Sequence, residues 1–249
     1  MTDSLVYRRI VLKLSGEALK GKLSHGFSGE AIASTAGLIK DATDAGVQMA
    51  IVVGGGNFFR GLSAGDTQIE RCTADSIGML ATVMNGLALR DGLLHAGVRA
   101  ELMSALAFPG LTQAFDSRAA TKHLAEGTVL ILSGGTGHPF FTTDTTAALR
   151  ACQLSVDAVV KATKVDGVYS ADPHKHPDAV RFRSLAYGDA IQKRLGVMDS
   201  TAFSLCMDNA IPILVCNFSE KGGLLRVLSG DRTKATLVAN VETVPDAPA

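Results

Sequence analysis

Glycines, threonines and two aromatic residues stand together at 134–143, in the sequence GGTGHPFFTT. Glycines leave backbone N–H groups open to a ligand, and threonine hydroxyls add further hydrogen-bonding groups. Phe140 and Phe141 either stack on a flat base or belong to the core. Asp144 follows, and it either caps the next helix or takes part in a site. The composition favours a binding loop for a small polar ligand that contains a flat ring.

Cations accompany two further glycine-containing segments. Lys13 precedes Ser15-Gly16 in LKLSG, an arrangement that indicates a lysine aimed at phosphate. Three glycines at 54–56 form a candidate anion-binding nest, and Arg60 adds a guanidinium that can bind phosphate oxygens through two hydrogen bonds. GEALKGKL at 16–23 nearly matches a phosphate-binding motif, but Leu23 replaces the hydroxyl that would bind Mg²⁺. We therefore regard that match as coincidental.

A fourth polar segment, KATKVDGVYSADP, occupies 161–173. Lys161 supplies a cation, Thr163 a hydroxyl, Tyr169 an aromatic face and Asp172 an acceptor, although turns and polar loops have a similar composition. Together the four segments predict two adjacent subsites for nucleotides or phosphates. The His174-Lys175-His176 run that follows is interpreted as part of a polar loop rather than as a metal site.

Short apolar runs alternate with segments of helical periodicity, and this alternation predicts the elements that carry the polar segments. The predicted strands are 9–14, 48–53, 98–103, 128–133, 157–162 and 211–217, and the predicted helices are 28–45, 74–96, 116–126, 144–154, 199–210 and 220–229. Such alternation is typical of an α/β fold: a three-layer αβα sandwich with an open, mostly parallel central sheet. Ligands of such sheets bind beyond the carboxyl ends of the strands, which is where the polar segments lie.

Composition narrows the possible partners. The 249 residues carry 24 Lys plus Arg and 24 Asp plus Glu, so there is no overall positive field to attract nucleic acid or an anionic membrane. No apolar signal core is visible at the N-terminus, and no run approaches the about 18 apolar residues of a membrane span. Four irregularly spaced cysteines are typical of free thiols in a reducing compartment. We expect a cytoplasmic protein without nucleic-acid or membrane partners.

The polar segments resemble those of a known family. LKLSGEAL, GGGNFFRG, GMLATVMNGLALRD, GTGHPFFTTDTTAALR and KATKVDGVYSADP are similar, in this order, to segments of the amino acid kinase superfamily and within it of the bacterial uridylate kinases. The resemblance covers nearly the whole chain. It implies transfer of the γ-phosphoryl group of ATP to UMP, giving UDP and ADP in pyrimidine nucleotide biosynthesis. It also implies one domain over 1–249, with a UMP-side lobe at about 1–162 and an ATP-side lobe at about 163–249.

Site residues follow from the same resemblance. The implied UMP site comprises Gly55, Asp75, Thr136, Gly137, His138, Pro139, Phe140, Phe141, Thr142 and Thr143. The implied ATP site comprises Lys13, Leu14, Ser15, Gly16, Gly56, Arg60, Thr163, Tyr169 and Asp172. Lys13 and Lys161 bracket the transferred group, and Asp144 orients the two lysines. The chain departs from the family pattern on the UMP side, where His138 replaces the usual asparagine and Asp75 has atypical neighbours.

The resemblance further implies Mg²⁺ on the ATP phosphates, without protein ligands to the metal. It implies a homohexamer, with GTP and UTP as effectors of an allosteric enzyme. Two other functions remain open at this stage. One is a nucleotide-binding storage or regulatory protein of the same fold, which does not need cations on both sides of one phosphate. The other is an amino-acid kinase of the superfamily, which would need a cationic clamp where this chain has phenylalanines and threonines.

Overall fold

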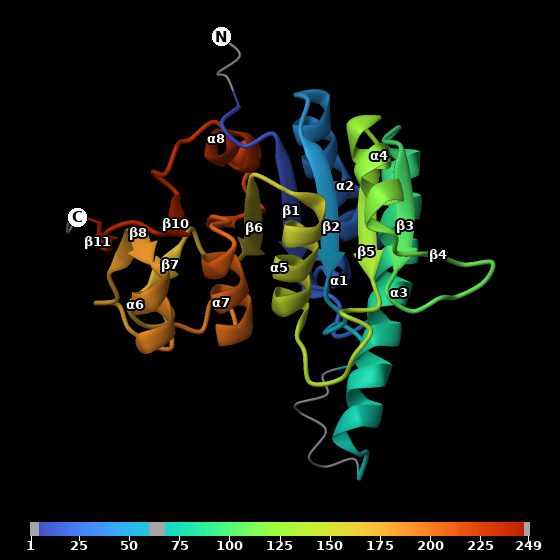
Figure 1. Cartoon of the computed structure of the whole chain (residues 1–249), viewed down its shortest axis with the longest axis horizontal. Helices are drawn as coiled ribbons and strands as arrows, with labels where there is room; N and C mark the ends of the chain where they lie inside the picture. The colour runs from blue at the N-terminus through green and yellow to red at the C-terminus, as the bar shows by residue number, and fades with distance from the viewer. Residues whose placement is uncertain (1–4, 60–67, 247–249) are drawn as a thin grey trace.

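A single sheet runs through the computed structural model, which describes residues 5–59 and 68–246 (Figure 1). Its strands are β1 (Arg9–Leu14), β2 (Gln48–Val53), β3 (Ala100–Ser104), β4 (Gln113–Ala114), β5 (Val129–Ser133), β6 (Ala158–Thr163), β7 (Val168–Tyr169), β8 (Arg181–Ala186), β9 (Ile213–Asn217), β10 (Ala235–Ala239) and β11 (Val244–Pro245). They lie in the order β11-β8-β10-β9-β6-β1-β2-β5-β3-β4, and β7 pairs with β8.

Most neighbouring strands are parallel. The central strands β9, β6, β1, β2, β5 and β3 all run in one direction. Antiparallel pairing is confined to the other half of the sheet, where β10 pairs with β9 and both β7 and β11 pair with β8. The predicted open, mostly parallel sheet is therefore confirmed, and the antiparallel strands lie beside the carboxyl-terminal part of the chain.

Helices cover both faces of the sheet, as the predicted three-layer sandwich requires (Figure 1). The described helices are α1 (Glu17–Lys20), α2 (Gly29–Asp44), α3 (Arg71–His95), α4 (Ser117–Ala125), α5 (Thr143–Leu154), α6 (Tyr187–Gln192), α7 (Ser200–Asp208) and α8 (Gly223–Leu228). Alternate residues of β1 enter different cores: Leu12 packs in the core under α2, α3 and α8, whereas Val11 packs in the core under α4, α5 and α7. Lys13 has the same parity as Val11, so its side chain lies on the α5 face.

By length and composition alone, α3 is apolar enough to cross a membrane, although no run of the sequence approaches 18 consecutive apolar residues. Within the fold, α3 packs against β3, β5 and α2, and Leu89 and Leu93 are fully buried. Core helices of globular proteins can be as long and as apolar as a membrane span. The buried side of α3 packs as the side of such a core helix does.

The carboxyl ends of the parallel strands lie along one edge of the sheet. At this edge β1 leads into Ser15-Gly16, β2 into the glycines at 54–56, β5 into Gly134 and β6 into Lys164. The fold thus brings the polar segments of the sequence to a common edge, as predicted.

Candidate active site

Three charged side chains meet at the centre of the carboxyl edge. Lys13 of β1 and Lys161 of β6 are partners in the register of these two strands, so both side chains lie on the same face. Asp144, in the first turn of α5, lies between them: Nζ of Lys13 is 2.8 Å from Oδ1, and Nζ of Lys161 is 2.7 Å from Oδ2. The three side chains are only 12%, 14% and 14% exposed. Two ammonium groups thus share one carboxylate in a largely buried position, and the charge of Asp199 also acts on Lys161.

Burial and ion pairing act against each other in this cluster. Burial raises the pKa of Asp144, but the charges of Lys13 and Lys161 outweigh it, and the net pKa is below the usual value. For Lys161, burial lowers the pKa, and the charge of Lys13 adds to this effect while Asp144 opposes it. Asp144 therefore stays ionised, and Lys161 gives up its proton more readily than an ordinary lysine.

A segment not singled out in the sequence fixes the cluster from the α7 side. Lys161 donates a hydrogen bond to the carbonyl oxygen of Val197. Two residues later, the carboxylate of Asp199 accepts from the hydroxyls of Thr142 and Thr145, which begin α5. Asp199 also caps α7 by accepting from the N–H of Ala202 at 2.8 Å. The sequence signal was only the start of a helix at Asp199, and it carried no sign of the contact with α5.

A cavity of about 140 Å³ adjoins the cluster on the side of α3 and β5. Six residues of the implied UMP site, called the acceptor site below because UMP would accept the phosphoryl group, line this cavity: Gly55, Asp75, His138, Phe141, Thr142 and Thr143. Thr142 and Thr143 stand directly before Asp144 in the chain, so the cavity lies next to the charged cluster. Phe141 is half exposed and presents its ring to the cavity rather than to the core.

The loop between β5 and α5 is held mainly through its backbone. Gly134 has a φ of +74°, and a Cβ there would lie 2.5 Å from Oγ of Ser104, so only glycine fits. Its N–H donates to the hydroxyl of Thr82 at 2.8 Å. Further along, the N–H of Phe140 donates to Oδ2 of Asp75 at 2.8 Å. Asp75 therefore supports the loop as well as lining the cavity.

Four other predicted acceptor-site residues do not line this cavity: Thr136, Gly137, Pro139 and Phe140. The hydroxyl of Thr136 takes part in a local turn with the backbone of His138. Phe140 is 63% exposed, and its ring lies 5.3 Å from the guanidinium carbon of Arg71. The two phenylalanines, neither of which is a core residue, thus have different surroundings.

A second cavity, of about 440 Å³, reaches the cluster at Lys161. Lys161 lines it together with Thr163, Tyr169 and Asp172 of the implied ATP site, called the donor site below because ATP would donate the phosphoryl group. Leu14 and Ser15 instead line a separate cavity of about 480 Å³, in which Thr163 also takes part. Gly56 lies in the turn after β2, and Arg60 lies outside the described residues. The predicted donor site is therefore divided between two cavities that share Thr163.

A buried pair of asparagines, not predicted from the sequence, holds the glycine loops together. Asn57 and Asn85 exchange amide hydrogen bonds of 2.9 Å and 2.7 Å, and Asn85 also donates to the carbonyl oxygen of Gly54. A Cβ on Gly16 would lie 2.3 Å from Oδ1 of Asn57, so this glycine is required by close packing. The available signal was one amide side chain in the apolar run GMLATVMNGLALRD.

Comparison with known proteins gives a consistent result. A profile of the amino acid kinase family matches residues 8–217, a range that contains the whole charged cluster. The crystal structure of UMP kinase from Bacillus anthracis is similar with a TM-score of 0.92 and 34% sequence identity, covering 97% of this chain and 99% of that one. The crystal structure of UMP kinase from Ureaplasma parvum has a TM-score of 0.87 and 35% identity, covering 94% of this chain and 99% of that one.

Proposed function

Because the chain belongs to the amino acid kinase family, we propose that it transfers the γ-phosphoryl group of ATP to UMP, giving UDP and ADP. The observation that carries this proposal is the position of the Lys13–Asp144–Lys161 cluster between two cavities. Residues next to Asp144 line the cavity of about 140 Å³, and Lys161 lines the cavity of about 440 Å³. UMP phosphorylation is the activity named for both of the similar crystal structures.

The chemistry needs alignment and charge neutralisation more than proton transfer. An oxygen of the UMP phosphate is already anionic, so it attacks the γ-phosphorus without a general base. A new O–P bond forms while the bond to the β,γ-bridging oxygen breaks, and ADP leaves with that electron pair. Lys13 and Lys161 neutralise charge on the transferred group, and Asp144 holds the two ammonium groups in place.

Mg²⁺ enters the proposal as a companion of ATP. Among residues 5–59 and 68–246, no group of three or more His, Cys, Asp or Glu side chains is placed to hold a metal ion. Asp144, the carboxylate at the cluster, is engaged by both lysines. This donor set fits an ion carried by ATP phosphates and water rather than a cage of protein ligands. When bound there, Mg²⁺ supplies further charge neutralisation at the phosphate oxygens.

The assignment of residues to the two substrates is also proposed. We assign the cavity beside Asp75 and Phe141 to UMP, and the cavity beside Thr163, Tyr169 and Asp172 to ATP. The division of 1–249 into a UMP-side lobe at about 1–162 and an ATP-side lobe from about 163 is supported by these linings. All the described lining residues of the UMP cavity precede 162, whereas those of the ATP cavity begin at Lys161.

Assembly and regulation complete the proposal. We expect a cytoplasmic homohexamer that acts in pyrimidine nucleotide synthesis and responds to GTP and UTP. Support for assembly comes from α3, where Leu80 and Met84 are exposed although large and apolar. Light scattering checks this point, since a monomeric mass at all concentrations would contradict it.

The decisive measurement is ADP release from ATP and Mg²⁺ with UMP, CMP, dTMP or acetylglutamate as the acceptor. UMP is expected to give the highest kcat/KM. A preference for acetylglutamate would instead indicate an amino-acid kinase. Nucleotide binding without ADP release would indicate a storage or regulatory protein.

A further inference from the structure

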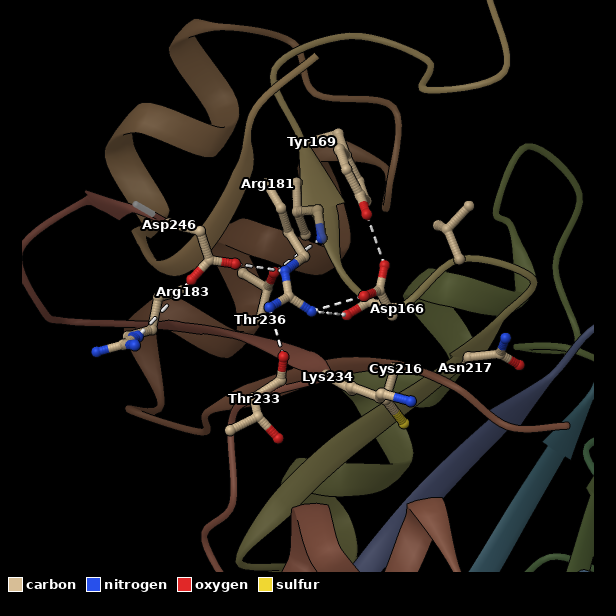
Figure 2. A network of polar contacts seen from close by, with 12 residues as sticks. Asp166, Tyr169, Arg181, Arg183, Cys216, Asn217, Thr233, Lys234, Thr236 and Asp246 are labelled. Carbon is tan, nitrogen blue, oxygen red and sulfur yellow. Dashed lines mark hydrogen bonds and ion pairs between the residues drawn. The ribbon is translucent and has the colours of Figure 1, made fainter. Parts of the chain in front are cut away.

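One wall of the cavity of about 440 Å³ is a turn that packs against the side chain of Arg181. Gly167, Val168 and Tyr169 line the cavity. The side chain of Arg181, which does not line it, lies beside Gly167 and is shown with its polar partners in Figure 2. A Cβ at Gly167 would lie 3.0 Å from Cδ of Arg181 and 2.5 Å from the hydroxyl oxygen of Thr236. The turn therefore rests directly on the side chains behind it.

The guanidinium of Arg181 joins this turn to two later parts of the chain. Nη1 donates to Oδ2 of Asp166 at 2.7 Å and to the carbonyl oxygen of Asp166 at 3.2 Å. Nη2 donates to the carbonyl oxygen of Thr233, and Nε donates to Oδ2 of Asp246. The side chain of Arg181 is only 14% exposed, so these bonds are partly shielded from water.

Asp166 connects Arg181 with Tyr169, which lines the cavity. Its Oδ1 accepts from the phenol of Tyr169 at 2.6 Å, while its Oδ2 is held by Arg181 (Figure 2). The hydrogen bond to Asp166, which does not line the cavity, thus fixes the orientation of the Tyr169 ring. Burial and the neighbouring carboxylate of Asp166 raise the pKa of Tyr169 to about 12, so the phenol remains a donor at neutral pH.

The end of the described chain closes the arrangement. Asp246 accepts from Arg181 through its side chain, and its N–H donates to the carbonyl oxygen of Arg181 at 2.8 Å. Asp246 and Arg181 lie 65 residues apart in sequence. The carboxyl-terminal segment therefore takes part in shaping a cavity wall that it does not line.

We propose that Arg181 and Asp246 are positioning residues of the donor pocket, and that the carboxyl-terminal segment thereby sets the affinity for ATP. The inference rests on the proposed function, which assigns this cavity to ATP. Neither residue lines the cavity. Both act through Asp166, whose carboxylate orients Tyr169, and through the backbone of Gly167 and Val168.

The test compares Asp246→Asn with Arg183→Met. Arg183 is also on β8 and also faces Asp246, at 3.7 Å, but it is 66% exposed and is thus a matched control. Asp246→Asn is expected to raise the Kd for ATP, measured by calorimetry without acceptor, by about tenfold, the order expected for the loss of a charge-assisted hydrogen bond. Asp246→Glu, which keeps the charge, should restore the affinity, and Arg183→Met should leave it unchanged.

The KM for UMP and the melting temperature separate positioning from general support of the fold. Positioning predicts a larger Kd and KM for ATP with an unchanged KM for UMP. A lower melting temperature with unchanged ATP affinity would overturn the inference, as would equal changes for both substrates. Failure of the proposed function has a different signature: the native protein would bind ATP but release no ADP with UMP, and the Kd comparison among variants would still be measurable.

Discussion

The two walls that flank the charged cluster are built differently. On the acceptor side, the loop from Gly134 to Phe140 is held through its own N–H groups, which donate to Thr82 and Asp75. On the donor side, the turn at 166–169 is held by side-chain charges, chiefly the guanidinium of Arg181. Backbone conformation therefore determines the first wall, and ion pairs between distant segments determine the second.

This difference predicts how each side tolerates change. A wall that depends on backbone conformation is sensitive to residue size and φ, and to the side chains of Thr82 and Asp75 that accept from its N–H groups. A wall that depends on partly buried ion pairs is sensitive to the loss of any partner, because the other charge then lacks its counter-ion. Between the two walls lies the cluster of Lys13, Asp144 and Lys161. If Lys13 acts on the transferred group, as proposed, its loss should lower kcat without distinguishing the two sides.

The largest expected effect tests that shared centre. Lys13→Met keeps the aliphatic length and removes the charge. We expect kcat to fall by roughly a hundredfold or more, about 3 kcal/mol, as when one preorganised electrostatic group is lost. Initial-rate kinetics should show the KM values for UMP and ATP changing little. The melting temperature should also change little, because Lys161 still pairs with Asp144. A near-normal kcat would remove Lys13 from the mechanism.

Asp75→Asn should affect the acceptor side alone. The amide keeps the size of the side chain but weakens the acceptor for the N–H of Phe140 and removes the ion pair with Arg71. We expect the KM for UMP to rise by about tenfold, the order of one charge-assisted hydrogen bond. The KM for ATP should stay within experimental error. Arg71→Met serves as the control, since it removes the ion pair with Asp75 and the contact with the ring of Phe140 but leaves the hydrogen bond from the N–H of Phe140 to Asp75. An equal rise in both KM values would mean that Asp75 supports the fold generally.

High pH should weaken the donor side first. The pKa of Lys161 lies below 10.5 because burial, together with the charge of Lys13, outweighs the effect of Asp144. The charge of Lys161 is therefore lost as the pH rises through that lowered pKa. ATP binding should weaken severalfold with this rise, before pH 10.5 is reached, because one phosphate-facing cation is lost. The pKa of Tyr169 is about 12, so its phenol does not titrate in this range.

Calorimetry of ATP binding from pH 8 to 10 checks this expectation. In the window between the lowered pKa and 10.5, the unfolded chain binds more protons at Lys161, so this group makes folding more favourable as pH rises. Weaker binding there is not caused by Lys161 destabilising the fold. The matched variant is Lys161→Arg, whose guanidinium stays charged, and a pH dependence that persists in it would rule out Lys161 as its source.

The smallest effect concerns backbone strain on the acceptor side. Phe140 has a φ of +71°, which is unfavourable for a side chain with a Cβ. Phe140→Gly should raise the free energy of unfolding by less than about 1 kcal/mol, because relief of strain slightly exceeds the entropic cost of glycine. Phe141→Gly is the control, since Phe141 has no positive φ and should only lose stability. Denaturant unfolding measures both, and destabilisation by Phe140→Gly would show that the Arg71 contact outweighs the strain.

The same contrast explains what the sequence could predict of the site. The acceptor loop was visible because its glycines, threonines and phenylalanines are adjacent in sequence, so local composition was enough. The grouping of Lys13, Asp144 and Lys161 followed from the family resemblance, and the structure brings the three within ion-pair distance. Arg181 and Asp199 were missed because their partners lie many residues away and neither has an unusual neighbourhood in sequence.

The fold shows a parallel limit. The strands β1 and β2 match their predicted ranges, and β5 and β6 match within one residue, because continuous apolar runs are typical of buried parallel strands. The strand β8 was missed because RFRSLA carries two arginines and resembles a polar segment. Its partner β10 has only five residues, and their pairing depends on contacts that local periodicity does not report.

The pairing of Lys13 with Lys161 across β1 and β6 fixes the separation of the two backbone positions that carry the cations of the proposed transfer centre. Neighbouring strands lie about 4.8 Å apart wherever backbone hydrogen bonds join them, so the sheet acts as a ruler for the two cations. Exchange of loop residues leaves that ruler unchanged. A combinatorial library aimed at a new acceptor can therefore vary 138–141 while keeping β1, β6, the start of α5, and Gly135 and Gly137, whose positive φ favours glycine. Each member then keeps the pairing of Lys13 with Lys161.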